Sequence, residues 1–105
     1  MTLEELKTRC NEQNIQYAYG LFKTPVEPPF LVAITRDSDN FMADNKVYEK
    51  QVPIQLSYIF IDKDLSIENK IEENILGDIP WNKTEEAYIS DEKVWEVSYF
   101  FELNK

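Results

Sequence analysis

The sequence predicts an α+β domain: a mostly antiparallel sheet of four to five strands with two amphipathic helices packed on one face. Two patterns carry this prediction. Apolar and polar residues alternate over residues 93–103, as in a half-buried strand, whereas in residues 2–13 and 64–76 apolar residues recur every three or four positions, as in amphipathic helices. The 105 residues have the length of one domain, so we expect a single domain over residues 1–105.

The first helix is predicted to begin at Thr2. Thr2 and Glu5 have the spacing of a capping box, in which each side chain accepts a hydrogen bond from the other residue's backbone N–H. The apolar residues that share one face of this helix are Leu3, Leu6 and Cys10. This stripe is narrow and the rest of the helix is polar, so only one face is expected to pack.

Strands are predicted where apolar residues alternate with polar or smaller ones, over residues 15–22, 30–35, 51–61, 84–89 and 93–103. The last has the clearest pattern, with five apolar residues on one side: Trp95, Val97, Tyr99, Phe101 and Leu103. In the second strand, Phe30, Val32 and Ile34 share one side. The pattern does not decide whether residues 41–48 form a strand or a loop.

A second helix is predicted from the cap residue Asp64 to about Leu76. Isoleucines at spacing four form its apolar stripe, and the acidic and amide residues between them, including Glu68 and Glu72, are expected to face solvent. Gly77 follows at the position where a left-handed residue often ends a helix. The adjacent turn carries one large apolar anchor, Trp81.

Composition argues against most catalytic and metal chemistry. The chain has no His, so histidine-based catalytic triads and metal sites are excluded, and its single Cys10 excludes an internal disulfide. Twenty acidic residues against 11 basic ones give a net charge of -9, which disfavours stable binding to nucleic acid. We therefore expect no enzyme activity, no cofactor, no metal and no small-molecule substrate. No apolar run approaches the ~18 residues of a membrane span, so no membrane contact is expected.

Three groups of acidic residues have some features of a metal-binding or catalytic site. The segment from Asp62 to Glu73 has oxygen ligands at calcium-loop positions, but Ile67 stands where that loop requires Gly. Glu96 and Glu102 lie in an apolar strand, yet their alternation predicts the solvent face. A third grouping could chelate a hard cation but is more typical of a solvated turn: Asp37, Asp39 and Asp44.

Several segments together resemble a known protein family. They are residues 17–22, 28–32, 41–48 with the Ala-Asp-Asn-x-x-Tyr box at 43–48, the strand at 53–61, the Asp-Lys-Asp helix start at 62–64 that leads into 67–73, and the closing strand at 95–103. The chain resembles small prophage proteins encoded among the head-to-tail joining genes of long-tailed phages of Gram-positive bacteria. These are similar to tail terminator or tail completion proteins.

The resemblance implies a non-enzymatic virion assembly protein with an α+β fold. It implies a ring, usually six-fold, that caps the head-proximal end of the tail tube, stops tail polymerisation and docks on the connector. The expected partners are copies of itself, the tail-tube protein and the head-tail connector protein. The expected location is the host bacterial cytoplasm during assembly and then the virion tail.

Residues 36–48 are polar but contain Phe41 and Met42, which predicts an exposed assembly loop that orders on contact. Its candidate residues are Asp37, Asp39, Phe41, Met42, Asp44, Asn45 and Lys46. A related hypothesis concerns the ring channel, where carboxylates on the inner wall would repel passing DNA.

Two alternatives stay open. A small acidic domain can mimic DNA and inhibit a host DNA-binding protein, but this requires a continuous stripe of acids, and here Lys and Arg residues interrupt them. A small-molecule binding module is the other alternative.

Overall fold

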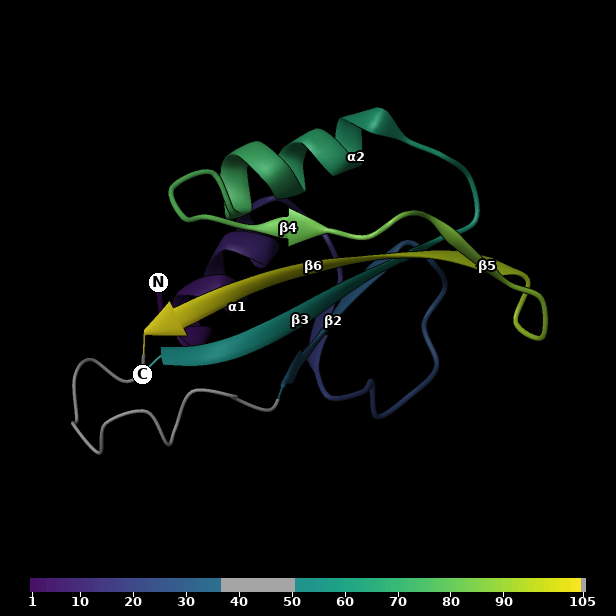
Figure 1. Cartoon of the computed structure of the whole chain (residues 1–105). Helices are drawn as coiled ribbons and strands as arrows, with labels where there is room; N and C mark the ends of the chain where they lie inside the picture. The colour runs from purple at the N-terminus through teal and green to yellow at the C-terminus, as the bar shows by residue number, and fades with distance from the viewer. Residues whose placement is uncertain (37–50, 105) are drawn as a thin grey trace.

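The computed structural model describes residues 1–36 and 51–104, and these form an α+β fold with one six-stranded sheet (Figure 1). The strands follow the order β1-β2-β3-β6-β4, and β5 also pairs with β6. Only the β1–β2 pair is parallel. The strands are β1 (Tyr17–Tyr19), β2 (Phe30–Thr35), β3 (Gln51–Phe60), β4 (Asn82–Lys83), β5 (Ala87–Ile89) and β6 (Val94–Asn104).

The centre of the sheet is the long antiparallel pair of β3 and β6, which runs from Gln51 opposite Asn104 to Phe60 opposite Trp95. Alternate residues of both strands are buried on one face, as their sequences predict: Ile54, Leu56, Tyr58 and Phe60 on β3, and Val97, Tyr99, Phe101 and Leu103 on β6. Trp95 differs, because it is 37% exposed and its ring lies 5.2 Å from that of Tyr88.

The core face of β2 consists of Leu31 and Ala33, which are fully buried. Phe30, Val32 and Ile34 do share one side, but it is the side away from the core. Both sets of side chains are apolar, so alternation alone cannot tell which set is buried. The register decides, because Leu31 lies opposite the buried Tyr58 of β3.

The first helix, α1 (Leu3–Glu12), begins as predicted. The Glu5 backbone N–H donates to Thr2 Oγ1 at 3.2 Å, and the Thr2 N–H donates to Glu5 Oε1 at 3.0 Å, which completes the capping box. Leu6 and Cys10 are fully buried, and this confirms the narrow apolar stripe.

The second helical segment changes its winding part-way. Asp64 caps α2 (Leu65–Asn69) by accepting hydrogen bonds from the N–H groups of Ser66 and Ile67 at 2.9 and 3.4 Å. The chain then continues as a π-helix, η1 (Lys70–Ile75), and the Leu76 N–H donates to the carbonyl of Ile71, five residues back. The predicted start is therefore confirmed, whereas a regular α-helix to Leu76 is wrong.

Gly77 ends this segment for a steric reason. Gly20 is the described glycine with a positive φ, at 85°, so the predicted left-handed conformation of Gly77 is wrong. A Cβ atom on Gly77 would lie 2.1 Å from the carbonyl oxygen of Glu73, which is far inside van der Waals contact. The backbone of the preceding helical turn therefore leaves room only for glycine here.

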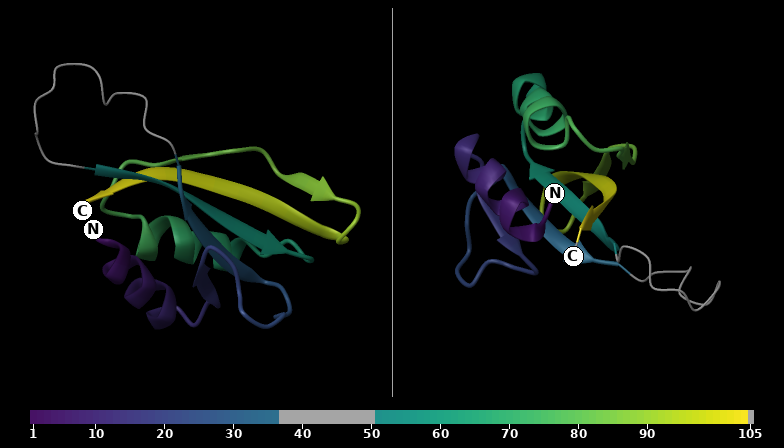
Figure 2. Two further views of the ribbon diagram at one scale, coloured as in Figure 1. Left: turned by 90° about the horizontal axis from the view of Figure 1, so that it is seen from below. Right: turned by 90° about the vertical axis from the view of Figure 1, so that its left-hand side faces the viewer.

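Both helical segments pack on the same face of the sheet and share one core with it (Figure 2). Because β3 and β4 are each antiparallel to β6, the link that contains α2 and η1 crosses over β6. Neither helix of the described chain has the length and apolar character needed to cross a membrane.

Candidate assembly surface

The sequence-predicted assembly loop lies outside the described residues. All seven of its candidate residues fall within positions 37–50: Asp37, Asp39, Phe41, Met42, Asp44, Asn45 and Lys46. The structure does describe the residues that flank this segment, Arg36 and Gln51, and both line one groove.

This groove has a volume of about 550 Å³ and lies at one end of β3 and β6. The Arg36 guanidinium sits over the ring of Phe100, 4.5 Å from its centroid, in a cation–π contact. The Arg36 backbone N–H donates to the carbonyl of Pro53 at 2.8 Å, which holds this end of β2 against β3. Trp81 and Glu102 also line the groove, which therefore combines aromatic surface with both signs of charge.

The groove continues onto the sheet face that points away from the helices, called here the open face. Its centre is polar: Gln55 Nε2 donates to Ser98 Oγ at 3.2 Å, and the hydroxyls of Ser57 and Ser98 lie 3.4 Å apart. Apolar side chains surround this centre, and none of them is fully buried: Phe30, Val32, Ile34, Ile59 and Phe100. Among the described residues, no helix covers them.

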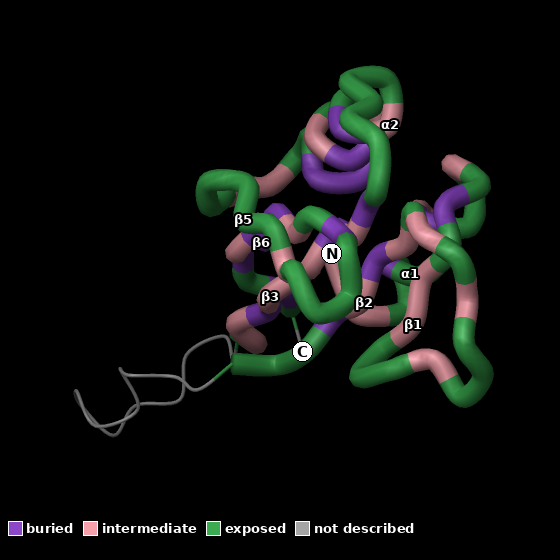
Figure 3. The backbone as a smooth tube through the Cα atoms, turned by 90° about the vertical axis from the view of Figure 1, so that its right-hand side faces the viewer, coloured by how far each residue is buried: buried purple, intermediate pink, exposed green. Residues whose placement is uncertain are grey.

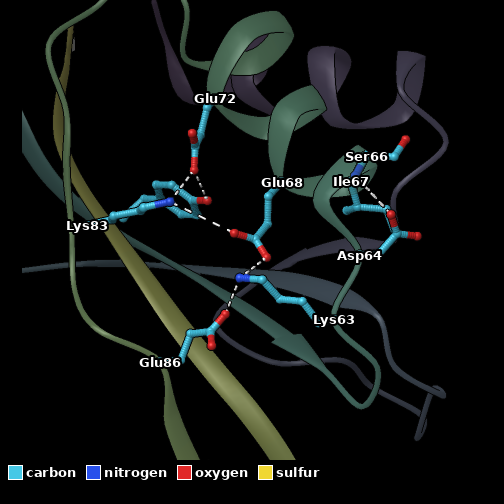
Figure 4. Close-up of polar contacts among 9 residues, drawn as sticks. Lys63, Asp64, Ser66, Ile67, Glu68, Glu72, Lys83 and Glu86 are labelled. Atoms are coloured by element: carbon cyan, nitrogen blue, oxygen red, sulfur yellow. Dashed lines mark hydrogen bonds and ion pairs between the residues drawn. The ribbon is translucent and has the colours of Figure 1, made fainter.

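A second group of polar residues lies on the opposite face, between α2 and the sheet (Figure 4). Glu68 is only 4% exposed, so the prediction that it faces solvent is wrong. Its two carboxylate oxygens lie near two lysines: Lys63 Nζ is 2.7 Å from Oε2, and Lys83 Nζ is 3.9 Å from Oε1. Lys63 also pairs with Glu86. The buried carboxylate is thus compensated by cations that other segments supply.

Glu72, one turn further along, is held in a similar way. Lys83 Nζ lies 2.6 Å from its Oε2, and the Tyr99 hydroxyl donates to the same oxygen at 2.8 Å. Burial, with the hydrogen bond to Glu72 as the next cause, raises the pKa of Tyr99. The hydrogen bonds from Lys63 to Glu68 and Glu86 raise the pKa of that lysine. At neutral pH the Tyr99 hydroxyl therefore stays protonated and Lys63 stays charged.

The arrangement is better suited to holding the helix than to catalysis. A general acid or base needs an accessible carboxyl group whose pKa is tuned toward neutrality. Here Glu68 and Glu72 are engaged by lysines and by Tyr99, and they tie α2 and η1 to β6 and to the segment that carries β4. Within residues 1–36 and 51–104, no group of three Asp, Glu or Cys side chains is placed to hold a metal ion.

The sequence contained one signal for this cluster. Glu68 and Glu72 are four residues apart and directly follow Ile67 and Ile71, so they border the apolar stripe instead of lying opposite it. The lysines could not be found in this way, because Lys63 precedes the helix and Lys83 lies on β4.

Cys10 is a core residue, as its position in the apolar stripe of the first helix predicts. Its side chain is fully buried, and burial raises the pKa of the thiol to about 12, which opposes formation of the nucleophilic thiolate. Comparison with known proteins adds no relative: no family model, curated protein or solved structure matches the chain.

Proposed function

We propose that the chain is a non-enzymatic phage virion assembly protein. It caps the head-proximal end of the tail tube as a ring and joins the tail to the head. Its partners are other copies of itself, the tail-tube protein and the head-tail connector protein. It works in the host bacterial cytoplasm during assembly and ends in the virion tail.

The observation that carries this proposal is the unequal covering of the sheet. One face is packed against both helices, whereas the open face keeps five partly exposed apolar side chains around a hydrogen-bonded polar centre. Apolar side chains grouped on a surface and mixed with polar groups are typical of protein–protein contact regions. An assembly protein needs such a surface, and an enzyme cleft is not required.

The position of the groove supports the same proposal. Arg36 and Gln51 line the groove and are the residues on either side of positions 37–50. The described residues that flank the predicted assembly loop therefore lie beside the open face.

The ion pairs favour assembly over DNA mimicry. A DNA mimic presents unpaired carboxylates in place of phosphates, but several acids here are neutralised within the fold. Arg9 pairs with Asp78 at 2.8 Å, and the lysines of the cluster hold three more carboxylates: Glu68, Glu72 and Glu86.

Electron microscopy of purified protein mixed with tail tubes tests the proposal. The native protein is expected to form rings at one end of each tube. Ile34→Asp places a charge on the open face at a side chain that is 40% exposed, so the variant should fold and yet decorate far fewer ends. Leu65→Asp is the matched control, because Leu65 is 64% exposed and lies on α2, away from the open face.

Bare tube ends with the native protein would overturn the proposal. Equal decoration by the native protein and by Ile34→Asp would show that the open face does not bind the tube. A native protein that ignores tubes and instead competes with DNA for a host DNA-binding protein would support the inhibitor alternative.

A further inference from the structure

The sheet has two different edges, and Figure 3 shows them on opposite sides of the molecule. β1 lies at one end of the strand order, and β5 lies beside β6 at the other end. Within the described chain, the outer side of each edge strand has no pairing partner. Such an edge presents backbone N–H and C=O groups that can pair with a strand of another chain.

Exposed apolar side chains are concentrated at these two edges. Of the seven large apolar side chains that are exposed in the described chain, four lie there. Tyr19 and Leu21, at the β1 edge, are 50% and 71% exposed, and Tyr88 and Trp95, at the β5 edge, are 52% and 37% exposed. Each edge therefore has both unpaired backbone and apolar surface.

The two edges differ in charge. Residues 13–26, which include β1, contain no carboxylate and one cation, Lys23. Residues 85–96, which include β5, contain five carboxylates and one lysine. In a chain with 20 acidic residues, a neutral-to-basic edge opposite a strongly acidic one makes the two edges complementary.

The β1 edge also has a receiving groove. It has a volume of about 320 Å³, lies between α1 and β1, and is lined mainly by apolar atoms, with one lysine and one glutamate among its residues: Leu3, Glu4, Lys7, Tyr17, Ala18 and Tyr19. The β5 edge offers the aromatic pair of Tyr88 and Trp95, whose rings pack 5.2 Å apart. Aromatic side chains seated in an apolar groove are common anchors of protein interfaces.

We infer that the β1 edge of one copy binds the β5 edge of a second copy of this chain, with Tyr88 and Trp95 seated at the groove beside Tyr17 and Tyr19. Because the two surfaces differ, the contact is heterologous, and repetition of a heterologous contact closes into a ring when the rotation permits. Two β5 edges would repel each other through their carboxylates. The inference rests on the proposed ring and specifies its subunit contact.

Two variants, each blocking one edge, test the contact. Leu21→Asp adds a negative charge to the β1 edge, and Tyr88→Asp removes an aromatic anchor and adds charge at the β5 edge; both side chains are more than half exposed, so the fold should be retained. Leu65→Asp is the control. Association is measured by sedimentation velocity and native mass spectrometry over rising concentration, and folding by circular dichroism.

The native protein and the control are expected to associate beyond dimers as concentration rises. Each edge variant alone should remain monomeric, with association weakened by about tenfold or more. An equimolar mixture of the two variants should give a heterodimer and nothing larger, because each variant keeps one intact edge. This complementation is specific to a contact between unlike edges.

Three results would overturn the inference: a native protein that stays monomeric up to millimolar concentration, an edge variant that dimerises by itself, or a mixture that stays monomeric. The tube experiment keeps this test separate from the proposed function. If the edge variants decorate tube ends as the native protein does, the inferred edge contact is refuted and the proposed function stands. If the native protein leaves tube ends bare, the proposed function is refuted, whatever the results with the edge variants.

Discussion

The hydroxyl of Tyr99 on β6 donates a 2.8 Å hydrogen bond to Glu72 Oε2 on η1. Tyr99 is fully buried, and Lys83 lies 2.6 Å from the same carboxylate oxygen. One carboxylate thus joins the π-helix to two strands of the sheet. The two contacts compensate a charged residue that lies, partly buried, at the border of the core.

Tyr99→Phe is expected to lower the free energy of unfolding by about 1.5–3 kcal/mol, the range for hydrogen bonds to charged groups. The phenylalanine ring would keep the edge-to-face contact with Trp81, whose centroid is 5.6 Å away, so the loss reports on the hydrogen bond. Urea unfolding measures it. Tyr88→Phe is the control and should change stability by less than about 0.5 kcal/mol, because Tyr88 is exposed. Equal effects of the two changes would contradict the prediction.

The Glu68 cluster predicts an asymmetry between removing the anion and removing the cations. Glu68→Met should cost less than about 1 kcal/mol, because a buried charge is replaced by an apolar side chain and the lysines keep Glu86 and Glu72 as partners. Replacing Lys63 and Lys83 together by Met leaves Glu68 buried without a cation and should cost about 3–5 kcal/mol. Denaturant unfolding of both variants checks this order, and the reverse order would refute it.

Gly77→Ala is expected to destabilise the fold by about 2–4 kcal/mol, since its Cβ would lie 2.1 Å from the Glu73 carbonyl oxygen and the backbone must move. Gly20→Ala should cost only about 1–2 kcal/mol, because Gly20 has open space around it and only its positive φ is strained. Thermal unfolding separates the two. If Gly20→Ala were the more damaging change, the close approach at Gly77 would not be the governing constraint.

Stability should fall in alkaline solution. Burial raises the pKa of Cys10 from 9.0 to about 12 and those of Tyr17 and Tyr58 from 10.0 to about 12. The unfolded chain loses these protons first, so the contribution is complete below pH 9 and is lost as the pH rises toward 12. Of these three groups, the thiol titrates first in the unfolded chain, from about pH 9, and the two tyrosines join it as the pH approaches 10. Each group adds a slope of at most about 1.4 kcal/mol per pH unit.

Cys10→Ala checks this assignment. The variant should be less stable at neutral pH because a buried sulfur is removed, but its stability should fall less steeply than that of the native protein between pH 9 and 10. Urea unfolding at pH 8, 9 and 10 gives both slopes, and comparison with the native protein cancels the titration of other groups. Parallel slopes would show that the thiol is not responsible.

Replacing Phe41 and Met42 by Ser tests the predicted assembly loop. The double variant is expected to abolish ring assembly on tail tubes while the melting temperature stays unchanged, because the loop is predicted to order only on contact. Electron microscopy and circular dichroism measure the two properties. A collapse of the fold would show instead that these side chains belong to the core.

Local chemistry in the sequence was sufficient to predict the starts of both helices and the core face of the central strands. The capping box of Thr2 and Glu5 and the Asp64 cap each involve neighbouring residues, so their contacts do not depend on the rest of the fold. The alternation in β3 and β6 places most apolar residues on one face, with exceptions such as Ile59 and Phe100 on the other, and this majority indicates the core face.

The tertiary structure decided what depends on contacts between distant segments. Leu31 and Ala33 are buried in place of Phe30, Val32 and Ile34 because the pairing with β3 selects between two apolar faces. The candidate assembly loop was predicted from composition alone and stays a prediction, since residues 37–50 lie outside the described chain.

For the charged residues too, the sequence determines how many there are, and the tertiary structure determines where they lie. The sequence alone determined an acidic α+β chain without histidine, because composition and periodicity are properties of the chain itself. Only the tertiary structure decided that Glu68 is buried, since the cations that compensate it come from Lys63 and from Lys83 on β4. It alone also decided that a carboxylate-free edge and an acidic edge lie on opposite sides of one sheet, because strand order is set by long-range pairing that no local pattern encodes.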